Sequence, residues 1–317
     1  MKPTPFAYFR PDTVEEAVAC LSAHSGEARV LAGGQSLLAM MHQRLVRPTA
    51  LVDLGRIGGL CFLSADSGVL RVGAMTRHVD IERIRDAAVC AGYGVLPETA
   101  GLIGHLPIRT RGTFGGSLAH ADPRSEWCLL AVLLDAEIVV RGAAGERVLD
   151  ASSFFVGPYR TRLGPDEIVV EARFRYPAPT AVLTEFAVQH GGYPLVAAAA
   201  AVDLDPHGRI GAARVALGGV TGRPVRLPDV EMALLGERPD TALFDAAGRL
   251  AVEAVTPVAD GDDHDDRSYR LELAAALTTR AVRESVARNG RRSPDGREVP
   301  DGGQTSDGSN EEKGGRP

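Results

Sequence analysis

Hydrophobic positions along the chain repeat with helical or strand spacing, and changes in that spacing divide the chain into three units. In the first unit, residues 1–56, a capping box at 13–16 opens a helix with one apolar face. Two short apolar runs, Ala28–Leu31 and Leu51–Leu54, are predicted strands on either side of a second helix that begins near Ser36. The alternation of strand and helix predicts a small α/β unit.

The second unit, residues 57–176, combines an apolar helix with strands. The run Glu126–Leu134 is mostly apolar and is predicted to be helical. Two runs, Glu137–Arg141 and Glu146–Leu149, flank a Gly/Ala turn and predict a hairpin. The run Glu167–Tyr176 alternates between apolar and polar residues, which predicts a strand in a sheet with one face exposed to solvent.

The third unit, residues 177–287, begins at two prolines within three residues, which cannot continue a central strand. Two apolar runs joined by a polar turn predict paired strands, and two helical patterns follow. These predicted elements are Val196–Leu204, Ile210–Leu217, Pro228–Leu235 and Tyr269–Val286. Residues 288–317 are rich in Gly, Asp, Ser, Glu and Arg without apolar periodicity, so this tail is predicted to be disordered.

Composition narrows the classes of function. Apolar residues make up 44% of the 317 residues and charged residues 24%, which is typical of a globular protein. The formal net charge is −6, so the chain has no excess of positive charge that would attract nucleic acid. No apolar run is long enough to span a membrane and no signal peptide is recognised, so a cytoplasmic location is expected. The four cysteines form no C-x-x-C pair, which argues against an iron–sulfur or zinc site in this chain.

Two glycine-doublet motifs carry the strongest chemical signal. Ala32–Ser36 and Thr113–Ser117 each follow an apolar run and combine adjacent glycines with a small hydroxyl residue. Glycine tolerates the positive φ that aims successive backbone N–H groups into one concavity, and such a nest binds phosphate oxygens. Two such loops far apart in sequence suit a dinucleotide, although neither has the spacing of a Rossmann fingerprint. A single glycine doublet on its own is more often a plain turn.

The residues around these motifs resemble a known family. The longer stretches Leu31–Leu38 and Ile108–Pro123, with weaker matches at Leu163–Ile168 and Leu217–Val220, are similar to the FAD-binding medium subunit of the molybdenum hydroxylases. That group includes xanthine dehydrogenase and aerobic carbon monoxide dehydrogenase. The resemblance covers about residues 1–287 and leaves out only the tail.

The resemblance implies an α+β fold. The expected architecture is a two-lobed PCMH-type (vanillyl-alcohol-oxidase-like) FAD-binding domain, followed by a C-terminal antiparallel sheet with helices. The small lobe would be residues 1–56, the larger lobe 57–176 and the C-terminal domain 177–287, with the tail at 288–317.

The resemblance also implies a set of cofactor-binding residues. The two glycine motifs would hold the pyrophosphate, Glu126 would hydrogen-bond the cofactor through ribose hydroxyls, and Leu163 would be an apolar contact. The segment Phe186–Tyr193 corresponds to a strand that faces the isoalloxazine, with Tyr193 as the aromatic neighbour of the ring. The full set is Ala32, Gly33, Gly34, Gln35, Ser36, Leu37, Thr113, Phe114, Gly115, Gly116, Ser117, Glu126, Leu163 and Tyr193.

Alternative interpretations of these residues stay open at the sequence level. Glu126 is equally well explained as a solvated acid favoured at a helix start, and Tyr193 as an ordinary strand aromatic. Ala187 and Gly192 depart from the family pattern, which commonly has a basic and an acidic residue there. The absence of a cation near the flavin is expected to change its reduction potential.

The implied function is electron transfer within an oxidoreductase complex. FAD would accept electrons from a 2Fe–2S subunit and pass them to NAD, a quinone or another acceptor. The expected partners are a large molybdopterin-binding subunit and a small 2Fe–2S subunit, assembled as a dimer of heterotrimers, and no side chain here is expected to be catalytic or to bind metal. Two rival hypotheses are a stand-alone flavin oxidase or reductase and a non-catalytic scaffold that has lost FAD.

Overall fold

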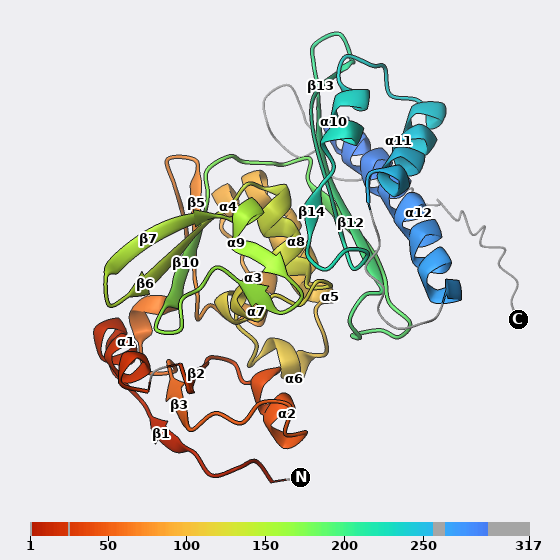
Figure 1. Cartoon of the computed structure of the whole chain (residues 1–317). Helices are drawn as coiled ribbons and strands as arrows, with labels where there is room; N and C mark the ends of the chain where they lie inside the picture. The colour runs from red at the N-terminus through yellow and green to blue at the C-terminus, as the bar shows by residue number, and fades with distance from the viewer. Residues whose placement is uncertain (1, 25, 256–263, 291–317) are drawn as a thin grey trace, which may run out of the picture.

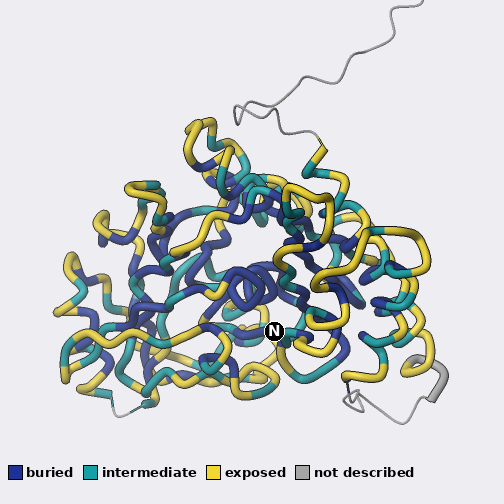
Figure 2. Tube along the Cα trace, turned by 90° about the horizontal axis from the view of Figure 1, so that it is seen from above, coloured by how far each residue is buried: buried dark blue, intermediate teal, exposed yellow. Residues whose placement is uncertain are grey.

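The computed structural model describes residues 2–24, 26–255 and 264–290. It consists of mixed helix and sheet, in agreement with the predicted α+β class (Figure 1). Buried segments run through the interior while exposed loops form the rim (Figure 2). Most of the predicted tail lies outside the described residues.

A three-stranded parallel sheet, in the order β1-β3-β2, forms the centre of the small lobe. Its elements are β1 (Ala7–Phe9), α1 (Val14–Ala23), β2 (Ala28–Leu31), α2 (Leu37–His42) and β3 (Ala50–Asp53). The predicted capping box is present: the Thr13 hydroxyl accepts the Glu16 N–H at 3.1 Å, and the Glu16 carboxylate accepts the Asp12 N–H at 2.9 Å. Strand β1 was not predicted from the sequence.

The larger lobe contains a five-stranded antiparallel sheet in the order β4-β5-β10-β6-β7. Its strands are β4 (Leu63–Asp66), β5 (Val69–Gly73), β6 (Glu137–Gly142), β7 (Gly145–Asp150) and β10 (Ile168–Phe174). Between and around them lie η1 (Gly58–Leu60), α3 (His78–Glu82), α4 (Ala87–Tyr93), α5 (Val95–Leu102), α6 (Leu106–Arg109), α7 (Phe114–His120), α8 (Glu126–Leu133), α9 (Ala151–Phe154), β8 (Phe155–Gly157) and β9 (Arg160–Thr161). Every residue of α8 is buried, so this helix is the centre of the lobe.

Strand β10 does not have the exposed face that its alternating sequence predicted. Five of its seven residues are buried, Glu171 among them. Ile168 packs into the small-lobe core with residues of α1, whereas Ala172 and Phe174 pack into the core of the larger lobe. The expectation of a wet face was therefore wrong. A bulge between Val169 and Glu171 breaks the alternation, so that Val169 packs into the same core as Ala172, and the buried Glu171 forms ion pairs with Arg71 and Arg173.

The C-terminal part is a four-stranded antiparallel sheet, in the order β11-β12-β13-β14, that lies between two helical layers (Figure 1). Its elements are β11 (Val182–Phe186), β12 (Val196–Leu204), β13 (Ile210–Gly218), β14 (Val225–Arg226), α10 (Pro228–Leu234), α11 (Thr241–Glu253) and α12 (His264–Asn289). Along β12, Ala197, Ala199 and Ala201 pack into the same core as α8. The intervening Ala198 and Ala200 pack into the core formed with α12. The predicted strand at Phe186–Tyr193 was wrong beyond its first residue, because β11 ends at Phe186 and a loop follows.

Candidate cofactor-binding site

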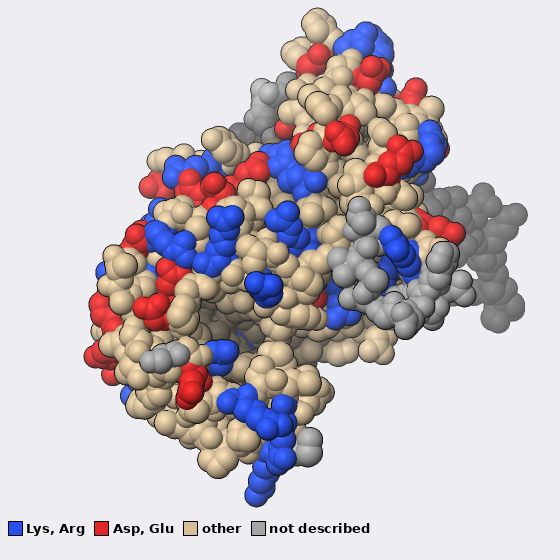
Figure 3. Space-filling view, in the orientation of Figure 1, with Lys and Arg blue, Asp and Glu red and all other residues tan. Residues whose placement is uncertain are grey.

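The fold brings the two glycine motifs together. A Cβ atom on Gly33 would overlap the Arg111 carbonyl oxygen and would lie 2.8 Å from the Cα of Gly112. A Cβ atom on Gly116 would lie 3.6 Å from the Cβ of Ala32. The first motif therefore packs directly against the segment that leads into the second, and glycine is required at position 33 because backbone atoms occupy the space of a side chain. On this face of the molecule, a hollow separates the small lobe from the rest, with basic side chains at its rim (Figure 3).

The first motif has the properties expected of an anion-binding turn. It leaves the end of β2, passes through Gly34 at φ +75°, and enters α2. Among residues 2–24, 26–255 and 264–290, no acceptor receives a hydrogen bond from the backbone N–H groups of residues 33–37. Consecutive backbone donors without acceptors are what a nest offers to a phosphate oxygen.

The second motif differs from the expectation, because it forms the first turn of helix α7. Neither Gly115 nor Gly116 has a positive φ. The amides of this turn are also occupied: Phe114 N–H donates to the Thr76 carbonyl, Gly115 N–H donates to the Ala74 carbonyl, both at 2.9 Å, and Gly116 N–H donates to the Thr113 hydroxyl at 3.2 Å. The prediction of a second amide nest was therefore wrong. These glycines are needed for close packing, Gly115 against Ala74 and Gly116 against the Thr113 hydroxyl, because an added Cβ atom would overlap the Cβ of Ala74 in the first case and would lie 2.6 Å from the hydroxyl oxygen in the second.

Glu126 begins helix α8 and is only 5% exposed, which rules out the solvated acid considered above. Burial, followed by the nearby charge of Glu185, raises the pKa of its carboxyl group to about 8. Burial also raises the pKa of Glu185, which lies on β11, to about 7. Within the described residues the Oε2 atom of Glu185 is buried and has no hydrogen-bond partner. A buried carboxyl group beside a half-buried one, whose buried oxygen is an unused acceptor, suits a ligand that brings hydroxyl donors.

Sequence reasoning missed Glu185. The only signal for it was an acidic residue in the short apolar segment Val182–Phe186. Its proximity to Glu126 depends on the packing of α8 against β12, the strand that pairs with β11, and no local pattern reveals that packing.

Tyr193 lies in the loop after β11, so the interpretation as a strand aromatic is also wrong. The Arg124 guanidinium lies over its ring at 5.0 Å from the centroid, and Arg124 pairs with Asp122 at 3.3 Å. Burial raises the pKa of the Tyr193 phenol, and a hydrogen bond with the Ser36 side chain opposes that effect. The loop of the C-terminal sheet therefore reaches the first glycine motif, with an aromatic ring that is 52% exposed.

The remaining predicted residue, Leu163, is half-buried against the core of the larger lobe. The described contacts do not join Leu163 to either glycine motif. The structure thus brings together the first motif, the start of α7, Glu126 and Tyr193, and the role of Leu163 stays a prediction.

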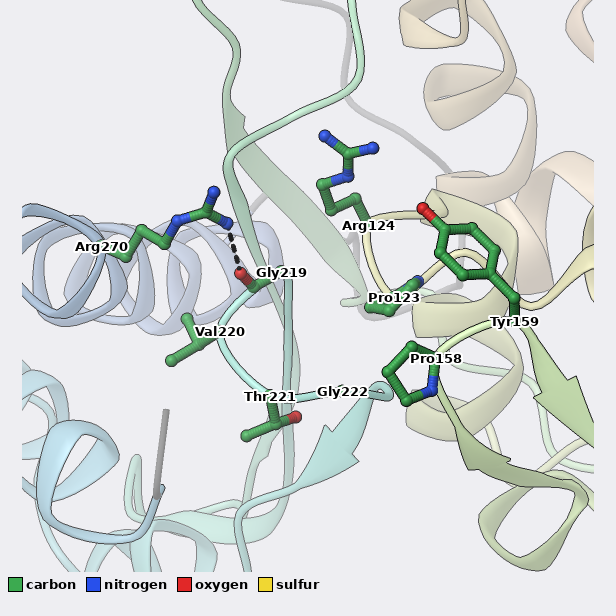
Figure 4. Close-up of a pocket in the computed structure, with 9 residues that line it drawn as sticks. All are labelled: Pro123, Arg124, Pro158, Tyr159, Gly219, Val220, Thr221, Gly222 and Arg270. Carbon is green, nitrogen blue, oxygen red and sulfur yellow. Dashed lines mark hydrogen bonds between the residues drawn. The ribbon is translucent and has the colours of Figure 1, made fainter. Parts of the chain in front are cut away.

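A separate cavity of about 220 Å³ opens where the larger lobe meets the C-terminal sheet (Figure 4). Arg124 and Tyr159 line it from the larger lobe, and Arg270 from α12 donates to the Gly219 carbonyl at 3.0 Å. Because Arg124 also lies over Tyr193, this cavity adjoins the aromatic loop. Among the described residues, no group of three or more His, Cys, Asp or Glu side chains could hold a metal ion. No described helix is long and apolar enough to cross a membrane.

The chain is similar to known proteins over about nine-tenths of its length. A family model described as "FAD binding domain in molybdopterin dehydrogenase" matches residues 4–177, and one described as "CO dehydrogenase flavoprotein C-terminal domain" matches residues 181–285. The nicotine 6-hydroxylase medium subunit of Paenarthrobacter nicotinovorans is 34% identical over 288 residues, covering 91% of this chain and 100% of that protein. The carbon monoxide dehydrogenase medium chain of Hydrogenophaga pseudoflava is 32% identical over 289 residues, covering 91% and 99%. The crystal structure of quinoline 2-oxidoreductase from Pseudomonas putida 86 superposes with a TM-score of 0.85 at 36% identity, covering 91% and 99%.

Proposed function

The chain belongs to the family of FAD-binding medium subunits of molybdenum hydroxylases, and from this premise we propose that it is the flavin-carrying electron-transfer subunit of such a complex. Its homologues are subunits of dehydrogenases and hydroxylases, so it is a component of an oxidoreductase. When bound, FAD would supply the capacity to accept electrons and pass them on. The chain's own residues bind that group and set its position.

The observation that carries the proposal is the row of unoccupied backbone donors in the first glycine motif. The N–H groups of residues 33–37 would receive the negative oxygens of the diphosphate, and no side chain at positions 33 and 34 would hold the phosphates away. The start of α7 would close the other side, with Thr113, Gly116 and Ser117 in contact with the ligand. The amides of Phe114 and Gly115 support this turn from within.

The buried acids fit the sugar part of the same ligand. A ribose or ribityl hydroxyl would donate to Glu126, and a second hydroxyl would reach the unpartnered oxygen of Glu185. Tyr193 would lie against the isoalloxazine, where its ring covers one face of the flavin. We retain Leu163 as an apolar contact only for the distal part of the ligand.

The domain organisation follows the family. We propose a PCMH-type FAD domain with lobes at 1–56 and 57–176, and a C-terminal domain at 177–287. The complex would add a large molybdopterin-binding subunit and a small 2Fe–2S subunit, as a dimer of heterotrimers in the cytoplasm. Electrons would arrive from the 2Fe–2S subunit and leave to NAD, a quinone or another acceptor. The four cysteines of this chain are free thiols, in keeping with a reducing compartment.

The test is to co-express the chain with the proposed large molybdopterin-binding and small 2Fe–2S subunits and to record the visible spectrum and metal content of the purified material. Flavin absorption at one FAD per chain, with iron and molybdenum in the co-purifying subunits, is the expected result. Flavin without partner subunits would favour the stand-alone oxidase or reductase. Folded, colourless protein that takes up no FAD would refute the proposal and favour the hypothesis of a non-catalytic scaffold.

A further inference from the structure

Arg77 is a second feature of the phosphate region that the glycine pattern does not reveal. Its backbone forms an antiparallel bridge with Thr113, the N-cap of α7. On either side of this bridge, Phe114 N–H donates to the Thr76 carbonyl at 2.9 Å and His78 N–H donates to the Gly112 carbonyl at 3.2 Å. Arg77 is therefore anchored at the point where the second motif begins.

The guanidinium of Arg77 extends from this anchor to the first motif. Its Nη1 atom donates to the Arg111 carbonyl oxygen. The same carbonyl oxygen occupies the space that a side chain on Gly33 would need. One backbone oxygen thus contacts both Arg77 and Gly33, which places the cation beside the row of unoccupied N–H groups.

Arg77 forms no ion pair with a carboxylate of residues 2–24, 26–255 or 264–290. The largest effect of another charge on it comes from a second cation, Arg111, and the more weakly acting Asp80 and Asp53 only partly oppose it. Burial, and then the charge of Arg111, lower the pKa of the Arg77 guanidinium. Arginine nevertheless stays protonated in proteins, so a half-buried positive charge persists here. Such a charge next to free backbone donors favours an anion.

We propose that Arg77 binds the diphosphate of the nucleotide directly, held in place by the Arg111 carbonyl and acting together with the N–H groups of residues 33–37. This rests on the proposed function, since it names a further binding residue for the same ligand. One Nη atom is committed to the carbonyl, and the planar guanidinium leaves its other N–H groups for phosphate oxygens. Arg77 is thus a positioning residue for the cofactor and takes no part in chemistry.

The experiment measures the dissociation constant of FAD by flavin fluorescence for the full chain and for Arg77→Gln, Arg77→Lys and Arg83→Gln. Arg83 is exposed just beyond α3, so its variant loses the same charge away from the motifs. We expect Arg77→Gln to bind FAD roughly tenfold to a hundredfold more weakly, Arg77→Lys to fall between it and the natural chain, and Arg83→Gln to be unchanged. The affinity of Arg77→Gln is also expected to depend less steeply on NaCl concentration.

A second ligand distinguishes a purely structural role of Arg77 from direct contact with the phosphates. Riboflavin carries no phosphate, so its binding is expected to change by less than about twofold in both Arg77 variants, whereas a collapsed site would lose FAD and riboflavin alike. Equal FAD affinity and salt dependence in the natural chain and either Arg77 variant would overturn the inference. If Arg77→Gln does not fold, Arg77→Lys alone decides. Failure of the natural chain to bind FAD would instead refute the proposed function.

Discussion

Replacing Glu126 by Gln is expected to stabilise the FAD-free protein at alkaline pH. Glu126 is almost completely buried, and its pKa rises from the ordinary 4.5 to about 8. Between these two values the folded protein holds a proton that the unfolded chain releases, so the folded state binds more protons. The free energy of unfolding therefore falls as pH rises: the stability is fully present below about pH 4.5 and is lost progressively up to about pH 8.

The size of this effect follows from the shift. Each pKa unit corresponds to about 1.4 kcal/mol, so the full shift from 4.5 to about 8 sets an upper bound of about 5 kcal/mol. Glu185 contributes to the shift of Glu126 and titrates with it, so the two effects do not add. Allowing for this coupling and for relaxation of the buried site, we expect Glu126→Gln to gain roughly 2 to 4 kcal/mol at pH 8 and close to nothing at pH 4.5.

The assay is thermal unfolding of FAD-free protein, followed by circular dichroism from pH 4.5 to 8.5. A gain of this size raises the unfolding midpoint by roughly 5 °C or more at pH 8. The control is Glu253→Gln, which makes the same charge change on the exposed side of α11. A Glu126→Gln protein that is less stable at pH 8, or equally stabilised at both ends of the range, would refute the reasoning. The same variant is expected to bind FAD about tenfold more weakly above pH 8, because only there does it exchange an anionic acceptor for a neutral amide.

Two further substitutions test the glycine motifs. Gly33→Ala is expected to lower the unfolding midpoint by several degrees and to abolish FAD binding, because its Cβ would lie 2.8 Å from the Cα of Gly112. The matched control is Gly58→Ala, since nothing lies within 4 Å of a Cβ at that position. Equal effects of the two substitutions would contradict the packing argument. Thr113→Ala is expected to cost about 1 kcal/mol by removing the N-cap bond to the Gly116 N–H, measured as a lower midpoint that Thr113→Ser restores.

The glycine motifs show what a local pattern can and cannot predict. Both were identified from composition, and the structure places them side by side. Their backbone roles differ, however, because the amides at 114 and 115 donate to carbonyls of Thr76 and Ala74, residues about forty positions earlier. The turn that follows β5 thus supports the second motif as the start of a helix. No spacing within Thr113–Ser117 carries that information.

Strand β10 and Glu126 show that a local sequence pattern also cannot predict which residues are buried. The alternation in β10 predicted its strand conformation correctly, yet a bulge between Val169 and Glu171 breaks the alternation, and cores on both sides of the strand bury its residues. Helix α8 was predicted nearly to the residue, but its first residue could not be recognised as buried. In both cases local periodicity determines the element, and contacts with distant parts of the chain determine which faces reach solvent.

The buried acid pair depends on the small residues of β12. Ala197, Ala199 and Ala201 face α8, and side chains of this size let a helix lie close against a sheet. That approach brings the start of α8, with Glu126, toward β11, which pairs with β12 and carries Glu185. A larger side chain at Ala199 would push α8 outward and separate the two carboxyl groups, without touching either. The alanine run, which looks like featureless core in the sequence, therefore helps to set the position of Glu126 relative to Glu185, on which the electrostatic part of the raised pKa of Glu126 and the hydroxyl site depend.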